Sequence, residues 1–136
     1  MNWYIQVLKK YAVFSGRARR KEYWMFVLFN IIFAVVAVIL DNILGTSFQG
    51  AGYGLFYLLY GLAVIIPSIA VGVRRLHDTD RSGWWLLICL IPIIGGIWLI
   101  VLLATAGTAG ENKYGADPKA SRCLIEKRQV HIIKSQ

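Results

Sequence analysis

Three long runs of uncharged, mostly apolar residues alternate with short charged segments along the chain. The runs cover residues 23–40, 51–73 and 83–106. Between residues 23 and 73 the one formally charged side chain is Asp41, and residues 83–110 carry no formal charge. As helices, the runs are long enough to reach across a hydrocarbon layer of about 30 Å, where a charge is costly. This pattern predicts an all-α integral membrane protein with three hydrophobic membrane segments.

The rival interpretation, a bundle of buried helices in water, conflicts with the length and composition of the chain. The chain has 136 residues, of which 57% are hydrophobic, and this is too apolar for an ordinary soluble domain. So short a chain cannot cover three uncharged helices on all sides. We therefore expect one membrane domain over residues 1–118 and a basic C-terminal tail over residues 119–136.

The charged segments predict how the first two runs are oriented. Apolar and aromatic residues recur at helical spacing in residues 1–14, which predicts a short helix in the membrane interface. The segment before the first run contains six Lys and Arg residues and one acid, Glu22, a balance typical of the cytoplasmic side. Residues 41–50 contain no Lys or Arg, whereas the second run ends at Arg74 and Arg75. We therefore expect a multi-pass protein with a cytoplasmic N-terminus. The first run is too long for a signal-peptide core, so we expect it to remain as an anchor.

The third run allows two topologies, because Pro92, Gly95 and Gly96 interrupt it near its middle. Its length favours a single crossing broken at these residues, since two halves of about 12 residues cannot each cross. The charge of the tail favours a segment that enters the membrane and returns, because six Lys and Arg residues follow residue 107 against three acids. A return requires that protein or water cover the broken backbone. We expect the single broken crossing, and the returning form stays open.

The densest polar cluster, RRLHDTDRSGWW at residues 74–85, lies between two uncharged runs. Its simplest interpretation is a cytoplasmic loop that sets the topology, in which Asp80 or Ser82 caps the next helix. Arginine side chains there can also bind lipid phosphates. Together with the basic segment before the first run, the loop supplies the candidate lipid- or anion-binding residues Arg17, Arg19, Arg20, Arg74, Arg75, His77, Asp78 and Arg81. The aromatic residues expected at the membrane interface are Trp24, Trp84 and Trp85.

Other functional classes find little support in these residues. His77 is the one histidine of the loop and three arginines would repel a cation, so we expect no metal site. Nucleophile and phosphate-binding motifs are absent from the sequence, so we expect no cofactor and no enzyme; an interfacial enzyme using His77 and Asp78 is an alternative. The orientation of the chain accounts for most of the net charge of +8, so we expect no nucleic-acid partner.

The leading hypothesis is a non-enzymatic membrane protein whose basic cytoplasmic face binds anionic lipid headgroups or a partner protein. The alternative is a subunit of a transporter or envelope complex. In that case Asn30, Pro67 and Ser68 would lie at helix contacts with a membrane-protein partner or with a second copy of the chain.

Three motifs in order along the chain resemble a known family. They are FSGRARRKEYW, RRLHDTDRSGWW and GTAGENKYGADP. Together they are similar to the signatures of the YhaH-like family of small bacterial inner-membrane proteins (domain of unknown function 805), over roughly residues 1–118. The family pattern commonly has Gly where this chain has Asp80, and Pro where it has Ala109 and Ala116.

This resemblance implies a location in the bacterial inner membrane and no established activity. If the tail is cytoplasmic, we expect the third motif to fold back over the other two. The three polar motifs would then share one face, which is the best candidate for a functional surface.

Overall fold

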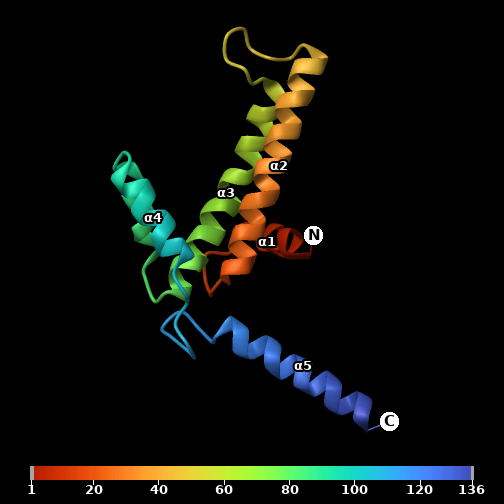
Figure 1. The fold of residues 1–136 in the computed structure, drawn as a ribbon, viewed down its shortest axis with the longest axis vertical. Helices are drawn as coiled ribbons and strands as arrows, with labels where there is room; N and C mark the ends of the chain where they lie inside the picture. The colour runs from red at the N-terminus through yellow and green to blue at the C-terminus, as the bar shows by residue number, and fades with distance from the viewer. Residues whose placement is uncertain (1, 136) are drawn as a thin grey trace. The chain divides into compact units, whose positions relative to one another are not determined.

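The computed structural model describes residues 2–135, with the side chains of residues 4–120 and 123–135. In this range the regular structure is entirely helical, apart from two isolated β-bridges. The helices, shown in Figure 1, are α1 (Asn2–Lys9), α2 (Arg20–Leu44), α3 (Leu55–Asp78), the 3₁₀ helix η1 (Gly83–Leu90), α4 (Ile94–Ala104) and α5 (Pro118–Lys134). The chain divides into two compact units, residues 1–13 with 21–71 and residues 14–20 with 72–136. The prediction of an all-α fold is confirmed.

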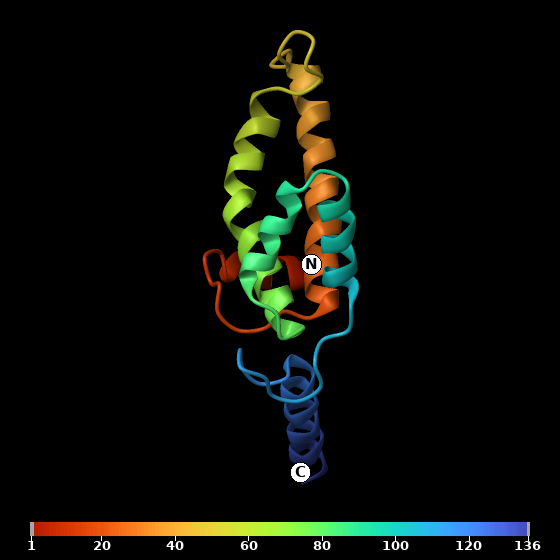
Figure 2. The same cartoon turned by 90° about the vertical axis from the view of Figure 1, so that its left-hand side faces the viewer.

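The first two apolar runs form α2 and α3, which lie side by side in the first unit (Figures 1 and 2). Both helices are long and apolar enough to cross a membrane. In the most apolar stretch of α2, 11% of the residues are buried, and in that of α3, 22%. Helices of a water-soluble core bury their apolar side chains. The exposed apolar surface of both helices therefore fits a lipid environment.

Asp41 is fully buried and joins α2 to the beginning of α3. Its carboxylate accepts hydrogen bonds from Thr46 Oγ1 at 2.6 Å and from the backbone N–H groups of Gly54, Phe56 and Tyr57 at 3.1, 2.9 and 2.9 Å. The N–H groups of a first helical turn have no partner within the helix. Asp41 therefore caps α3 from a different helix, which explains how a charge can lie at the end of an apolar run.

The N-terminal helix packs against α2 within the first unit. The Tyr4 ring stacks on Phe26 with centroids 5.4 Å apart, and Val7 is fully buried. The helix ends at Lys9, earlier than the predicted residues 1–14. Part of the apolar stripe of α1 is thus covered by protein instead of facing outward.

The third apolar run forms a hairpin of two short helices, η1 and α4 (Figure 2). Eight residues of 3₁₀ helix and eleven of α-helix each reach roughly 16 Å, about half of a hydrocarbon layer. The chain turns at Pro92 and Ile93, where Ile93 has a φ of 64°. Gly95 and Gly96 lie inside α4, and a Cβ at Gly95 would overlap the carbonyl oxygen of Ile88. Glycine at this position therefore permits the close approach of the two legs.

The third run, expected to be a single broken crossing, folds as a hairpin in the structure. Both of its ends contact the last turns of α3. At the start, a Cβ on Gly83 would lie 2.9 Å from Val73 Cγ1; at the end, the Leu103 carbonyl accepts a hydrogen bond from Arg75 Nε at 2.9 Å. Length argued for a crossing because each half is too short to span. In the structure the chain turns back at Pro92 and Ile93, so both ends of the run lie beside the last turns of α3.

We expect Asp41→Ala to lower the free energy of unfolding by about 2 kcal/mol, because three amide donors at the start of α3 lose their acceptor. Asn42→Ala is the matched control, since Asn42 is exposed and its side chain bonds only the Val38 carbonyl of its own helix in the described structure. Thermal unfolding of the purified protein in detergent measures both. Equal melting temperatures for the two variants would contradict the capping role.

Candidate functional site

The centre of the second unit is a buried carboxylate held between two buried guanidinium groups. Arg17 Nε donates to Asp78 Oδ1 at 2.9 Å, and Arg75 Nη1 donates to Asp78 Oδ2. The side chains of Arg17, Arg75 and Asp78 are 1%, 0% and 5% exposed. We call these three residues the Asp78 cluster. A buried charge requires a partner and further hydrogen bonds, and here each guanidinium has both.

The remaining donors of Arg17 hold the third motif, GTAGENKYGADP. Arg17 Nη1 donates to the Gly110 carbonyl at 2.6 Å, and Nη2 donates to the Thr108 carbonyl at 2.5 Å. Thr108 in turn donates its backbone N–H to the carbonyl of Asp78 at 2.8 Å. A Cβ on Gly107 would lie 2.5 Å from Asp78 Cγ, so this position needs glycine. The first and third motifs therefore meet at Asp78, which belongs to the second.

The remaining donors of Arg75 hold the end of α4. Besides the Leu103 carbonyl, Arg75 donates to the carbonyl of Thr105, directly after the helix, and to that of Ala18 at 3.4 Å. The last carbonyls of a helix have no partner within it and carry its negative dipole end. The buried cation satisfies these carbonyls and fixes the returning leg of the hairpin.

His77 is a second point at which the three motifs meet. Its ring stacks on Tyr114 with centroids 3.8 Å apart and planes 5° apart. Its Nδ1 lies 3.2 Å from the Gly16 carbonyl oxygen, and its own carbonyl accepts from Asn112 Nδ2 at 2.9 Å. Tyr114 and Asn112 were not predicted as site residues. No periodicity or spacing marks their contacts with His77, because His77 lies more than 30 residues away in the chain.

Part of the predicted lipid-binding set lies buried inside the protein. Arg74 is 1% exposed, and Arg17, Arg75 and Asp78 form the buried cluster. These four side chains, predicted as headgroup contacts, are buried in the protein, and Arg17, Arg75 and Asp78 are paired with one another. Their sequence pattern could not reveal this, because arginines that bind phosphate and arginines that bind buried carbonyls look alike.

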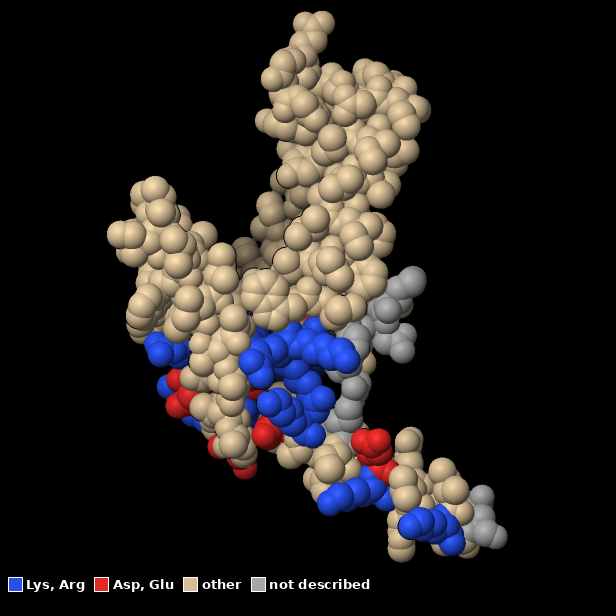
Figure 3. Space-filling model, viewed as in Figure 1, with Lys and Arg blue, Asp and Glu red and all other residues tan. Residues whose placement is uncertain are grey.

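The other predicted residues stay accessible to different extents. Arg20 is exposed, with Nη1 3.4 Å from the Ala104 carbonyl oxygen, and Arg19 is partly exposed and donates to the Pro118 carbonyl. Arg81 lies over the Trp85 ring at 5.0 Å from its centroid. Trp24 and Trp84, predicted at the interface, are 40% and 76% exposed. Figure 3 shows Lys and Arg confined to the lower half of the view, whereas the visible surface of the hairpin of η1 and α4 carries no charge.

The third motif ends in the cap of α5. Asp117 Oδ1 accepts from the Lys119 N–H at 2.8 Å, and Oδ2 accepts from the Gly110 N–H at 3.2 Å. The Lys119 hydrogen bond is the main cause that lowers the pKa of Asp117 below its ordinary value. Every described side chain of α5 beyond Pro118 is exposed. Among the described residues, no group of three His, Cys, Asp or Glu side chains is placed to hold a metal ion.

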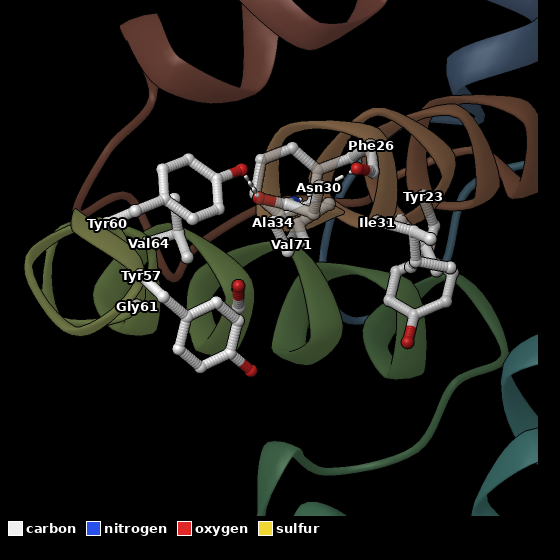
Figure 4. Close-up of a pocket in the computed structure, with 12 residues that line it drawn as sticks. Tyr23, Phe26, Asn30, Ile31, Ala34, Tyr57, Tyr60, Gly61, Val64 and Val71 are labelled. Atoms are coloured by element: carbon white, nitrogen blue, oxygen red, sulfur yellow. Dashed lines mark hydrogen bonds between the residues drawn. The ribbon is translucent and has the colours of Figure 1, made fainter. Parts of the chain in front are cut away.

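The first unit contains a groove of about 310 Å³ between α2 and α3 (Figure 4). Its lining is mostly apolar, and Asn30 Oδ1 accepts a hydrogen bond from the Tyr60 hydroxyl at 2.6 Å. Ser68 also lines the groove, whereas Pro67 is buried. Asn30, predicted at a helix contact, thus makes its contact within this chain.

Comparisons with known proteins show the family to which the chain is similar. The family described as Protein of unknown function (DUF805) matches residues 11–116. The chain is 56% identical to inner membrane protein YhaH of Escherichia coli K12 over 119 residues, which covers 88% of this chain and 98% of YhaH. It is 50% identical to inner membrane protein YhaI of the same strain, covering 88% and 97%. It is 32% identical to the uncharacterized protein YiiR, covering 76% and 84%. No solved structure matches the chain.

We expect Asp78→Asn to lower the free energy of unfolding by about 3–5 kcal/mol, because two guanidinium groups would stay buried without a counter-charge. Asp80→Asn is the matched control. It makes the same chemical change two residues away, at an exposed carboxylate that lies 3.9 Å from Lys113 Nζ. Thermal unfolding and limited proteolysis measure the difference, and similar losses in both variants would show that the cluster does not hold the unit together.

Proposed function

The chain belongs to this family of proteins of unknown function (DUF805), and we propose that it is a non-enzymatic membrane protein whose basic cytoplasmic surface binds anionic lipid headgroups. Its location in the inner membrane is supported by the names of its relatives, YhaH and YhaI. Lipid binding is the function that the charge distribution favours. The observation that carries the proposal is the Asp78 cluster, because it gathers the three polar motifs, two of them arginine-rich, at the ends of apolar helices.

The proposed topology has two crossings and one re-entrant hairpin. α2 and α3 span the membrane, and the hairpin of η1 and α4 enters it and returns. Both ends of the hairpin are bonded to the last turns of α3, beside Arg74 and Arg75. The basic tail then lies on the same side as these arginines, as the positive-inside rule favours. Directly after the break, Gly95 is buried against the Ile88 carbonyl of the other leg, which covers this part of the backbone.

The proposed headgroup contacts are those arginines of the predicted set that the fold leaves accessible, Arg19, Arg20 and Arg81. Basic residues near an anionic leaflet contribute about 1 kcal/mol each to membrane attraction. The Asp78 cluster has an indirect role, since it fixes the backbone that presents these residues. The burial of Arg17, Arg74 and Arg75 keeps their charge from the surface, but it makes the surface rigid.

The topology predicts that Cys123 and position 80 lie on the same, cytoplasmic side of the membrane. The test uses single-cysteine variants: Cys89→Ser keeps Cys123 as the one thiol, and further variants without either native cysteine carry Asp80→Cys or Gln49→Cys. All three reporter positions are exposed. In cells with a permeabilised outer membrane, an impermeant maleimide should label position 49 at once, and positions 80 and 123 only after lysis. Labelling of Cys123 without lysis would contradict the re-entrant hairpin.

Lipid binding predicts a several-fold lower ratio of anionic to zwitterionic lipid co-purified with Arg19→Gln/Arg20→Gln, because two surface charges are lost. Lys127→Gln/Arg128→Gln is the control: it removes the same charge from exposed positions on α5. Mass spectrometry of the extracted lipids gives the ratio. An unchanged ratio in the first variant would refute headgroup binding at this surface.

A further inference from the structure

A groove of about 300 Å³ follows the first turns of η1, outside the Asp78 cluster. Its walls are Ser82, Trp84, Trp85 and Ile88. Trp84 is 76% exposed, so an indole with both an apolar face and an N–H donor stands open at the edge of the groove. In the proposed topology the first turns of η1 lie where the hairpin enters the membrane. Tryptophan is common at this level, which explains why Trp84 is exposed in the protein alone.

A positive charge lies next to one residue of the groove lining, Trp85. The Arg81 guanidinium lies over Trp85, 5.0 Å from the ring centroid, and this contact orients it beside the groove. The neighbouring carboxylate of Asp80 lies 3.9 Å from Lys113 Nζ, which balances its charge and leaves that of Arg81 in excess. Ser82 adds a hydroxyl group. Its oxygen accepts a hydrogen bond from the backbone N–H of Trp84 at 3.4 Å, and this bond does not use the O–H donor of Ser82.

We propose that this groove binds one anionic phospholipid, with the phosphate on Arg81 and Ser82 and an acyl chain along Trp84, Trp85 and Ile88. The proposal rests on the proposed function, because the hairpin must lie in the membrane for a lipid to enter from the side. The residues at the groove match the two parts of a phospholipid, its phosphate group and its acyl chain. A guanidinium binds phosphate with two parallel hydrogen bonds, tryptophans suit the headgroup level, and Ile88 supplies an apolar wall.

The test measures lipid binding by the full-length protein in detergent, titrated with phosphatidylglycerol and, separately, phosphatidylcholine, and observed by native mass spectrometry. Arg81→Gln removes the phosphate contact, and Ile88→Trp fills the groove without changing charge. Ile97→Trp is the matched control, because Ile97 is a 61% exposed isoleucine on α4 outside the groove lining. We expect one phosphatidylglycerol on the wild type, an about tenfold weaker affinity in the first two variants, and wild-type affinity in the control.

The outcomes separate the groove from the general surface. If Ile88→Trp binds phosphatidylglycerol as the wild type does, the groove is refuted while the surface proposal stands. If Ile88→Trp loses the lipid but Arg19→Gln/Arg20→Gln retains its anionic lipid, the groove is supported and the surface proposal fails. If soluble glycerol 1-phosphate displaces phosphatidylglycerol completely, the site takes a phosphate group and not a lipid. A wild type without preference for phosphatidylglycerol over phosphatidylcholine refutes both proposals.

Discussion

The Asp78 carboxylate neutralises part of the charge on two buried guanidinium groups, and the second unit depends on this contact. Two cations facing one anion leave an excess positive charge, which backbone carbonyls of the third motif and of α4 stabilise. Without the carboxylate, Arg17 and Arg75 would both lose their buried counter-charge, and the cost would exceed what carbonyl hydrogen bonds return. The return of the hairpin and the position of the tail loop both follow from this arrangement.

Two buried charges of this apolar chain, Asp41 and Arg75, form hydrogen bonds with backbone groups at the ends of helices. Asp41 lies at the beginning of α3, where unpaired N–H groups give a positive dipole end. Arg75 lies at the end of α4, where unpaired carbonyls give a negative one. In a bilayer no water reaches such groups, so an internal partner replaces it. The beginning of α3 and the end of α4 therefore each contact a charge of the sign that the helix dipole favours.

The three motifs on which the family resemblance rests are thus the parts that build one folded unit. This explains how they can identify a family without naming a reaction: their polar side chains are largely used to bond one another. Asp80 illustrates the difference between a structural and a functional reading. It has a φ of 58°, a conformation that glycine adopts without strain, and this accounts for the glycine that the family pattern commonly has there. The residues left at the surface, among them Arg20 and Trp84, are better candidates for function than the buried ones.

The sequence by itself determined the class of protein, the three apolar runs and the extents of α2 and α3 to within a few residues. These three features follow from local properties of the sequence, because a charged residue is costly at any position inside a membrane helix. The tertiary structure alone decided that the third run folds as a hairpin, and which arginines are accessible. Length and charge pointed in opposite directions for that run, and the decision came from contacts of Arg17 and Arg75 with carbonyls about 30 to 90 residues away. Such contacts leave no periodic mark in a sequence, since an arginine that binds a distant carbonyl and one that binds a phosphate are the same residue.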